Sequence, residues 1–539
     1  MIELDAIVVG AGFAGLRALH TLRGHGFNVK AIEAGEDVGG VWYYNGYPGA
    51  RCDVESFDYS YRFSPELEQQ WRWTERYATQ PEILSYIRHV AERFDLRRDI
   101  EFNTRMTRAA YDEKAARWLV ETQDGRRWSA HLLVMCVGQL SLPKTPSFPG
   151  QDRFRGEIIH SAVWPKRKVD LAGKRVAIIG TGSSGMQMTP VIAKVAKHLT
   201  VFQRTANFSV PAANAPVTEE EDQYVKANYK ARREQAANSP TGLGFMPNRK
   251  SALDEKPEDR EKVYEAAYNR WGFGFALAYH DILLNKAAND TAADFIRKKI
   301  RERVNDPVVR EKLVPKDHAF ASRRPSVDSG YFEAFNRDNV TLIDVRADPI
   351  AAITPMGIRL KSGRECELDI IVFATGFDAM TGPLLKLNIT GAGGHTLAKD
   401  WEAGPKTYLG LQVAGFPNLF TITGPGSPSV LCNMPVCIEQ HVEWITDCLA
   451  HMQAKGVTRI ETTEAAMTEW GAEVQRAANA TLLPKVPHSW YLGANVEGKP
   501  RVFMPYAGGM AHYRGLCDTV AKQGYRGFVM TQTPQQVVG

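Results

Sequence analysis

Cysteine is scarce in this sequence, and no two cysteines have the Cys-x-x-Cys spacing. Seven cysteines are scattered over 539 residues, which indicates reduced thiols in a cytosolic setting and not a disulfide framework. The absence of a Cys-x-x-Cys motif also argues against a disulfide reductase, because such enzymes use a redox-active cysteine pair of that spacing. We also expect no metal site.

Long apolar runs and an excess of one charge are missing too. The longest apolar stretches, such as residues 132–137, are far too short for a membrane span. The 66 basic and 61 acidic residues leave a net charge of +5 without a basic tract, so neither a membrane nor nucleic acid is an expected partner. Residues 7–9 have the composition of a core strand and run straight into a glycine loop, so we expect no signal peptide and a cytoplasmic location.

The strongest motif stands near the start of the chain. The apolar residues 6–9 are followed by Gly10-x-Gly12-x-x-Gly15, a stretch with helical spacing and a second strand that ends on Glu33. Strand, glycine turn, helix, strand and acid form the fingerprint of a dinucleotide-binding unit. Gly10 permits the turn, Gly12 lets a pyrophosphate approach the helix N-terminus, and Gly15 lets helix and strand pack closely. Glu33 can accept hydrogen bonds from ribose hydroxyls.

A second unit repeats this pattern with one difference. Residues 175–179 lead into Gly180-x-Gly182-x-x-Gly185, a helix and a strand at 199–202, but the strand ends in Gln-Arg-Thr and not in an acid. An acid would repel a 2′-phosphate, whereas Arg204 can bind it with a bidentate, charge-assisted contact. A solvated surface arginine is the alternative. We therefore predict FAD at the first loop and NADPH at the second.

Three irregular stretches carry residues suited to a site. Residues 39–53 alternate glycine with aromatic residues and end on Asp53, so they form either a structural cluster over the sheet or a loop along a flat ring system. Arg323 and Arg324 are adjacent, so one can face a cofactor phosphate and the other a reaction site, unless both are surface arginines. Residues 490–501 form either a mobile lid or a surface loop.

The rest of the sequence divides the chain, for which we expect about two to four domains. A proline-rich stretch at 142–150 marks an exit from the first unit, and residues 369–378 return the chain to it. The helical composition of 211–318 indicates an insertion that either shapes a wall of the substrate cavity or is purely structural. We predict an α/β fold with two Rossmann-like dinucleotide-binding domains: FAD-binding residues 1–141 and 377–539, NADPH-binding residues 142–210 and 319–376, and an α-helical insertion at 211–318.

The segment between the two glycine loops resembles a family fingerprint. It reads Phe154-x-Gly156-x-x-x-His160-x-x-x-Trp164-Pro165, and the chain is similar to type I Baeyer–Villiger monooxygenases, above all to their phenylacetone-type and steroid-type members. Related flavin N-oxygenases and flavin-containing monooxygenases share both loops but usually lack the Trp-Pro ending. Further matching stretches lie at residues 39–42, 47–53, 374–378 and 424–429.

The resemblance implies roles for single residues. Arg324 falls on the catalytic arginine, Asp53 on its carboxylate partner within the FAD site, and Arg323 on a basic position, more often Lys in phenylacetone-type members, that contacts the 2′-phosphate. Further FAD contacts are implied at Gly40, Val41, Trp42, Tyr59 and Met434. Further NADP contacts are implied at Thr181, Ser183, Ser184, Gln187, Thr205 and Trp490. The implied pocket edge, which suggests aryl or bulky ketones over small cyclic ones, is Ser429, Val430 and Leu431.

The implied reaction explains these residue types. NADPH reduces FAD, O2 adds at the flavin C4a to give a peroxyflavin, and its attack on a ketone gives a Criegee intermediate that rearranges to an ester or lactone. An always-charged Arg324 suits stabilisation of the developing alkoxide better than lysine, and Asp53 would orient and satisfy it. No acid or base is needed at His160, for which we expect a hinge or packing role between the domains, with direct catalysis as the alternative.

Three other functions stay open on the sequence alone. An N- or S-oxidising flavin monooxygenase shares both loops, although Trp164-Pro165 argues against N-hydroxylation. A reductase or NADPH oxidase would pass hydride on without inserting oxygen, and a non-catalytic flavoprotein would leave two complete nucleotide sites unused. The expected partners are a small ketone and O2, and we expect a monomer, with a dimer as the alternative.

Overall fold

The first glycine unit folds as its sequence predicts. The computed structural model describes residues 1–270, 272–486 and 488–532. Strand β1 (Ile2–Val9) leads into helix α1 (Phe13–Gly24) and then β2 (Val29–Ile32), which pairs with β1 in parallel. The last four residues of β1 are buried, as expected for a parallel strand that is covered on both faces.

The sheet built on this unit is mixed and has eight strands. Its order is β17-β4-β5-β6-β1-β2-β3, with β18 paired to β6. Strand β6 lies between β1, to which it is parallel, and β5, to which it is antiparallel. The bounds are β3 (Ile100–Glu101), β4 (Met106–Asp112), β5 (Arg117–Thr122), β6 (Arg127–Met135), β17 (Asn388–Thr390) and β18 (Leu419–Thr421).

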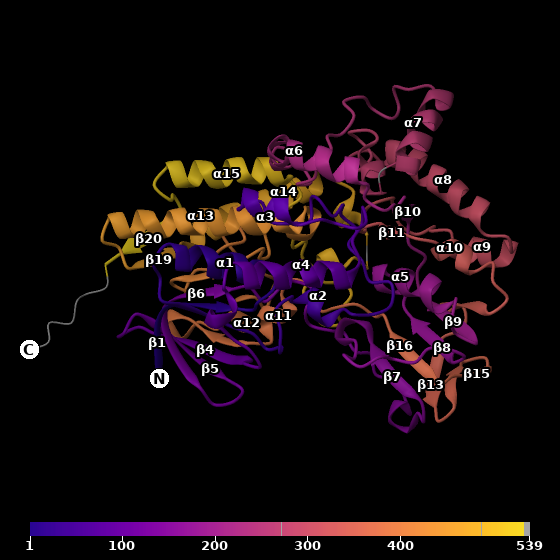
Figure 1. Ribbon diagram of the computed structural model, residues 1–539, viewed down its shortest axis with the longest axis horizontal. Helices are drawn as coiled ribbons and strands as arrows, with labels where there is room; N and C mark the ends of the chain where they lie inside the picture. Colours follow the sequence, from indigo (N-terminus) through magenta and orange to yellow (C-terminus); the bar gives the residue numbers. More distant parts are fainter. Residues whose placement is uncertain (271, 487, 533–539) are drawn as a thin grey trace, which may run out of the picture.

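Helices from both ends of the chain cover this sheet (Figure 1). Helix α13 packs against α1 and against α15, so the C-terminal segment completes the body that the N-terminus begins. The helices are α2 (Val41–Tyr44), α3 (Pro65–Gln70), α4 (Gln80–Arg93), α11 (Gly382–Leu385), α12 (Leu397–Asp400), α13 (Met434–Ala454), α14 (Glu464–Asn479) and α15 (Met510–Lys522). An antiparallel pair of short strands lies beside them, β19 (Arg459–Thr462) and β20 (Phe528–Thr531).

The second sheet is parallel, and the fingerprint segment is part of it. Its order is β12-β9-β8-β16-β7, so β7 is an edge strand. A Cβ at Gly156, just before β7, would lie 2.2 Å from the carbonyl oxygen of Asp369, so glycine allows this edge to approach β16. The elements are β7 (Glu157–His160), β8 (Arg175–Ile179), α5 (Ser183–Ile192), β9 (His198–Gln203), α10 (Tyr331–Ala334), β12 (Val340–Asp344) and β16 (Ile370–Phe373). A three-stranded antiparallel sheet adjoins it, β13 (Ile350–Thr354), β14 (Gly357–Leu360) and β15 (Glu365–Glu367).

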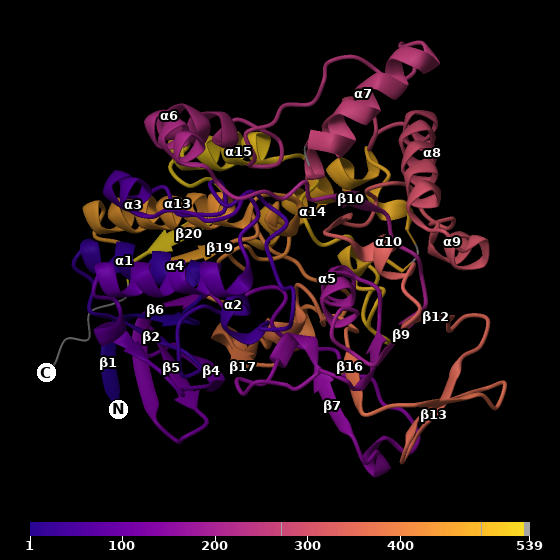
Figure 2. The ribbon, with the colours of Figure 1, turned by 45° about the vertical axis from the view of Figure 1, so that its right-hand side comes forward.

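The helical segment at 211–318 is shared between two hydrophobic cores. Tyr229 of α6 belongs to the core of the first sheet, whereas Tyr264 of α7 and Phe295 of α8 belong to the core of the second. In Figure 2, α6 lies above the first body and α7, α8 and α9 lie beside the second. The elements are β10 (Ser209–Pro211), α6 (Glu219–Ala237), α7 (Pro257–Arg270), α8 (Lys286–Arg303), α9 (Pro307–Leu313) and β11 (Ser326–Asp328), of which β10 and β11 pair in parallel.

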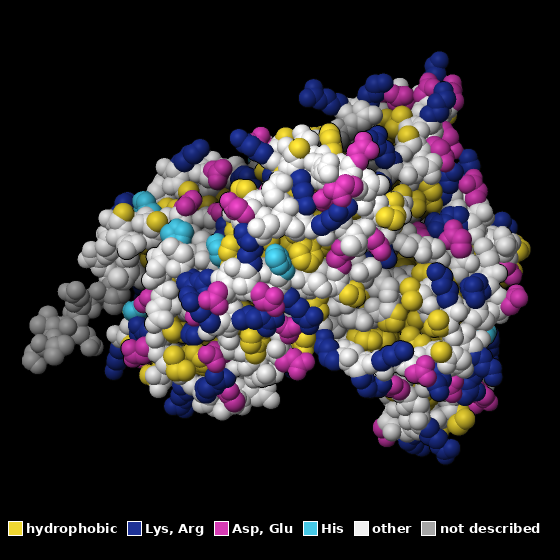
Figure 3. All heavy atoms as spheres, in the orientation of Figure 1, with side chains coloured by type: hydrophobic (Ala, Val, Ile, Leu, Met, Phe, Trp, Pro, Cys, Tyr) yellow, Lys and Arg dark blue, Asp and Glu magenta, His cyan; other side chains and the backbone are white. Residues whose placement is uncertain are grey.

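The surface agrees with the balanced composition. Basic and acidic side chains are interspersed over the face seen in Figure 3. Within the described ranges, no helix combines the length and the apolar character that crossing a bilayer requires. The same residues include no group of three or more His, Cys, Asp and Glu side chains arranged to hold a metal ion.

Candidate active site between the two glycine loops

Arg324 and Asp53 form a bidentate ion pair. They come from the segment just before β11 and from the loop after α2. The Nε of Arg324 donates to Asp53 Oδ2 at 2.7 Å, and its Nη2 donates to Oδ1 at 2.9 Å. Its Nη1 donates to the backbone carbonyl of Val430 at 2.8 Å. Three nitrogens are therefore fixed, and the guanidinium has a single orientation.

The environment keeps this arginine charged. Burial alone would lower the pKa of Arg324, but the charge and hydrogen bonds of Asp53 outweigh burial and raise that pKa well above its usual value. The Phe273 ring lies below the guanidinium, with its centroid 4.4 Å from Cζ, at a distance suited to a cation–π contact. Burial raises the pKa of the neighbouring Tyr491 to about 12, so its hydroxyl is neutral. The site thus offers one fixed cation among aromatic side chains.

The first glycine loop has the shape that a dinucleotide needs. Gly10 has φ +105°, and a Cβ there would lie 2.5 Å from the carbonyl oxygen of Cys136. The backbones of Gly12 and Gly40 lie against each other, so both loops present main chain and no side chain at the start of α1. Glu33 closes the unit, because its Oε2 accepts from the Ala11 amide at 2.8 Å. These residues fit FAD.

The aromatic residues expected in the FAD site are also brought together. Trp42 Nε1 donates to the Tyr59 hydroxyl at 3.2 Å, and the two rings meet edge to face at 5.7 Å. Val41 begins α2, next to Gly40. Met434 begins α13, and the preceding Asn433 donates to the backbone carbonyl of Asp58 at 2.7 Å. The segment that carries Tyr59 is therefore tied directly to the N-terminus of α13.

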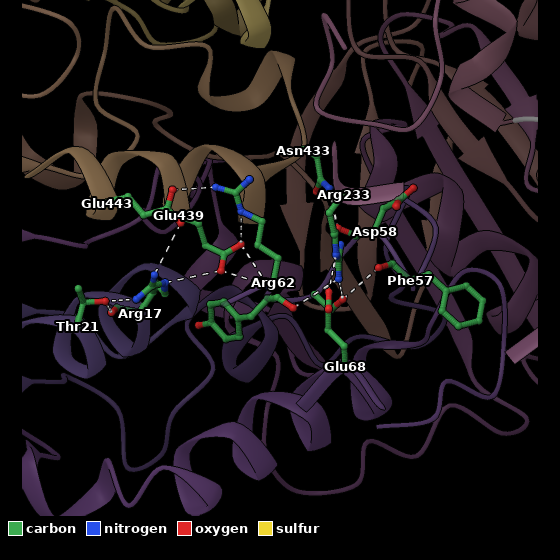
Figure 4. Close-up of polar contacts among 12 residues, drawn as sticks. Arg17, Thr21, Phe57, Asp58, Arg62, Glu68, Arg233, Asn433, Glu439 and Glu443 are labelled. Carbon is green, nitrogen blue, oxygen red and sulfur yellow. Dashed lines mark hydrogen bonds and ion pairs between the residues drawn. The ribbon is translucent and has the colours of Figure 1, made fainter. Parts of the chain in front are cut away.

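Helix α6 holds this same segment with two arginines. Arg232 donates to both oxygens of Asp58, from Nε at 2.6 Å and from Nη2 at 2.8 Å, and Nη2 also reaches Glu55 at 2.8 Å. Arg233 binds Glu68 and the hydroxyl of Ser60, each at 2.7 Å. Figure 4 shows Arg233 beside Glu68, and Asp58 below Asn433. These two arginines, Arg232 and Arg233, form an arginine clamp that fixes the stretch after Asp53.

The second glycine loop opens α5 and presents an uncovered surface. Nothing lies within 4 Å of a Cβ built on Gly182, so there is room for a pyrophosphate at this helix N-terminus. The loop also includes Gly180 and Gly185, and its Thr181 hydroxyl donates to the Thr205 carbonyl at 3.0 Å. The predicted phosphate ligand Arg204 is exposed just after β9. These features fit NADPH.

Other predicted NADP residues make contacts within the protein. The amide of Gln187 bonds the Tyr47 hydroxyl at 2.8 Å and the Arg51 carbonyl at 3.0 Å, so it joins the two bodies. The hydroxyl of Ser183 lies 3.3 Å from that of Ser326, and Ser184 follows it in the first turn of α5. The sequence pattern could not separate ligand contacts of this kind from contacts between domains.

His160 lies where the two bodies connect. Its Nδ1 accepts from the Ala162 amide at 3.1 Å, so the proton of the neutral ring sits on Nε2. Nε2 faces the Lys144 carbonyl at 3.2 Å and the Thr375 hydroxyl at 3.3 Å, and these residues lie on the outgoing and returning connections. Burial lowers the pKa of His160. These contacts support a packing role at the crossing, as expected from the sequence.

The remaining fingerprint residues pack on either side of this crossing. Phe154 lies against the core of the three-stranded sheet. Trp164 is buried, and its amide donates to the Tyr44 carbonyl at 3.1 Å, while Pro165 lines a shallow groove beside Tyr43. The fingerprint thus touches both bodies and not the ion pair.

The stretch around Trp490 is fastened to both interdomain connections. Lys499 Nζ donates to Asp378 Oδ1 at 2.6 Å, and Asn495 donates to the Phe377 carbonyl at 2.8 Å while its own carbonyl binds Lys144. Trp490 packs on Tyr491, with centroids 4.5 Å apart. In the same apolar cluster lie Met380, Val430 and, at its edge, Leu431.

The predicted pocket edge therefore reaches the ion pair. Ser429 is fully buried with φ 43°, and this turn aims the Val430 carbonyl at Arg324. The sequence did not single out Phe273, Tyr491 or Arg232. The glycine-aromatic run at 272–275 resembles the one at 39–53 and could have drawn attention to Phe273. No local pattern marks Arg232, which looks like an ordinary helix-surface arginine.

Comparison with known proteins agrees with this architecture. The family model described as flavin-binding monooxygenase-like matches residues 5–211. A Baeyer–Villiger monooxygenase of Pseudooceanicola batsensis is 46% identical, over 99% of this chain and 98% of its own length. The structure of an oxidised steroid monooxygenase bound to NADP is 52% identical with a TM-score of 0.95, over 98% of this chain and 100% of that one. A closed crystal structure of cyclohexanone monooxygenase is 41% identical with a TM-score of 0.96, over 99% and 100%. The chain belongs to the type I Baeyer–Villiger monooxygenases.

Proposed function

We propose that this Baeyer–Villiger monooxygenase oxidises aryl or bulky ketones and that Arg324 and Asp53 carry the step in which oxygen is inserted beside the carbonyl. The enzyme uses FAD and NADPH, which when bound would supply the electrons that activate O2. The observation that carries the proposal is the bidentate ion pair of Arg324 with Asp53, in a chain that has two complete dinucleotide loops.

Arg324 is suited to stabilise negative charge on the ketone oxygen. A fixed guanidinium costs no reorganisation when that charge develops, and it acts more strongly among apolar side chains than in water. Asp53 orients the guanidinium and keeps it charged. It accepts hydrogen bonds from Nε and Nη2 and does not use every N–H of the group. The carbonyl of Val430 holds the third nitrogen, so the fork cannot rotate away from the pocket.

The surrounding side chains support a bulky substrate. Phe273 covers one face of the arginine, and the cluster of Met380, Val430 and Tyr491 lies beside it. Aromatic and flexible apolar side chains suit a large, rigid ketone, because they bury much of its surface. The similarity to a steroid monooxygenase points the same way.

A substrate panel tests this proposal. The FAD-loaded enzyme is offered linear, small cyclic, aryl and steroid ketones with NADPH, and products are identified by mass spectrometry. We expect esters or lactones, with a kcat/KM for aryl and steroid ketones about tenfold or more above that for cyclopentanone. A preference for small cyclic ketones would overturn the substrate assignment, and NADPH consumption without an ester or lactone from any of the ketones would overturn the reaction.

The division of the chain is also part of the proposal. We propose FAD binding by residues 1–141 and 377–539, NADPH binding by 142–210 and 319–376, and a wall of the pocket contributed by 211–318. Phe273, which comes from that last segment, supports its role as a wall. The seven cysteines are all free, which supports a reducing cytoplasmic setting, and we propose a monomer, to be checked by light scattering.

A further inference from the structure

Two arginines project beyond the ends of neighbouring strands in the second sheet. Strands β9 and β12 are parallel neighbours, and the last residue of one pairs with the last residue of the other. Arg204 follows β9 directly, and Arg346 lies two positions beyond β12. The Nη2 of Arg346 donates to the hydroxyl of Thr205 at 2.9 Å. Arg346 therefore reaches across to the segment that was predicted to bind the 2′-phosphate.

Arg323 joins this group from a third segment. The pKa of Arg323 is lowered, chiefly by burial. The negative charge of Asp317 opposes this shift, and the positive charges of Arg204 and Arg346 add to it. The Nε of Arg323 is buried and has no hydrogen-bond partner among the described residues. A buried guanidinium N–H without an acceptor is costly, so an anion at this place would satisfy it.

Asp317 supplies the counter-charge in the group. Its Oδ2 accepts from Arg346 Nη2 at 2.9 Å, and its Oδ1 lies 2.8 Å from Nδ1 of His318. Burial lowers the pKa of His318, so that ring is a neutral donor. The guanidiniums of Arg204, Arg323 and Arg346 together with this one carboxylate leave a net charge of +2. A phosphate monoester, which carries about −1.5 to −2 at neutral pH, would balance it.

We propose that Arg346 is a further specificity-determining residue, which binds the 2′-phosphate of NADPH together with Arg204 and Arg323. Thr205 and Asp317 hold its guanidinium in place by one shared nitrogen, Nη2. Among the described residues Nη1 and Nε have no hydrogen-bond partner, so both can donate to the phosphate. This inference rests on the proposed NADPH site at the second glycine loop. The sequence alone did not suggest it, because 141 positions separate Arg346 from Thr205.

Calorimetry on the FAD-loaded enzyme tests the assignment without relying on catalysis. The two probes are adenosine 2′,5′-bisphosphate, which carries the 2′-phosphate, and adenosine 5′-monophosphate, which lacks it. For Arg346→Ala we expect the Kd of the bisphosphate to rise about tenfold, as for the loss of one hydrogen bond to a charged group. The Kd of the monophosphate should stay within about twofold. Arg346→Lys, which keeps the charge but loses the fork, should give an intermediate Kd for the bisphosphate.

Two further variants make each failure distinguishable. Arg359→Ala removes the same charge from an exposed position on β14 of the adjoining sheet and should change neither Kd. Arg204→Ala tests the NADPH site itself and should weaken the bisphosphate selectively and raise the KM for NADPH far more than that for NADH. If Arg204→Ala is selective but Arg346→Ala is not, the inference about Arg346 is wrong and the NADPH site stands. If neither is selective, the 2′-phosphate assignment fails as a whole.

Discussion

The carboxylate of Asp53 and the guanidinium of Arg324 face each other fork to fork, although 271 positions separate them in the sequence. Asp53 comes from the loop that is proposed to lie along the flavin, and Arg324 from the segment that follows the helical insertion. The pair therefore forms only when both nucleotide-binding bodies are in place.

Replacing the carboxylate by its neutral isostere should test whether the bidentate ion pair is needed for oxygen insertion. In Asp53→Asn the amide can accept only one of the two parallel bonds, so we expect kcat for ester formation to fall by about 10²-fold. Stopped-flow measurement of flavin reduction by NADPH should show a rate within a few-fold of the wild type. An unchanged rate of ester formation would mean that Asp53 has no part in positioning Arg324.

The arginine clamp from α6 should stabilise the segment that follows Asp53. In Arg232→Met the buried Asp58 loses its cation, and breaking a buried pair in this way costs about 3–5 kcal/mol. We expect a lower free energy of unfolding and weaker FAD retention, both measured during urea titration by flavin fluorescence. Lys230→Met, at an exposed position on the same helix, is the control. The double variant Arg232→Met with Asp58→Asn should recover part of the loss, and equal losses in the single and double variants would exclude the clamp.

His20 should make the fold sensitive to acid. Burial lowers its pKa to about 4, with smaller contributions from Arg17 and Arg23, whereas an unfolded histidine titrates near 6.5. The folded state thus favours the neutral ring, so its contribution to stability is complete above about pH 6.5 and is lost as the pH falls toward 4. His20 lies between the rings of Phe63 and Phe94. Thermal unfolding of His20→Phe from pH 7 to pH 4.5 should therefore show a smaller fall in Tm than the wild type, and parallel curves would contradict the assignment.

The sequence predicted the two nucleotide units well because each is a local pattern. The order of strand, glycine turn and helix at Gly10 and Gly180 depends on close neighbours in the chain, and the structure has both. The ion pair of Arg324 came from family resemblance and not from residue chemistry, since an arginine pair before a proline looks like many surface segments. Phe273 and Arg346 were missed because only the tertiary fold brings them to their partners. The fingerprint was recognised only as the segment between the two glycine loops. The structure shows that part of it is the edge strand β7, whose main chain pairs in parallel with β16.

The most direct test of the account is the product of the Arg324→Ala variant. The FAD-loaded variant is mixed with NADPH, O2 and a ketone that the wild type converts, and NADPH consumption, hydrogen peroxide and ester are measured together. We predict that NADPH is still consumed and that peroxide accumulates, while ester formation falls by at least about 10²–10³-fold, the loss typical of removing a group that stabilises developing charge. Ester formation near the wild-type rate would contradict the central role of Arg324.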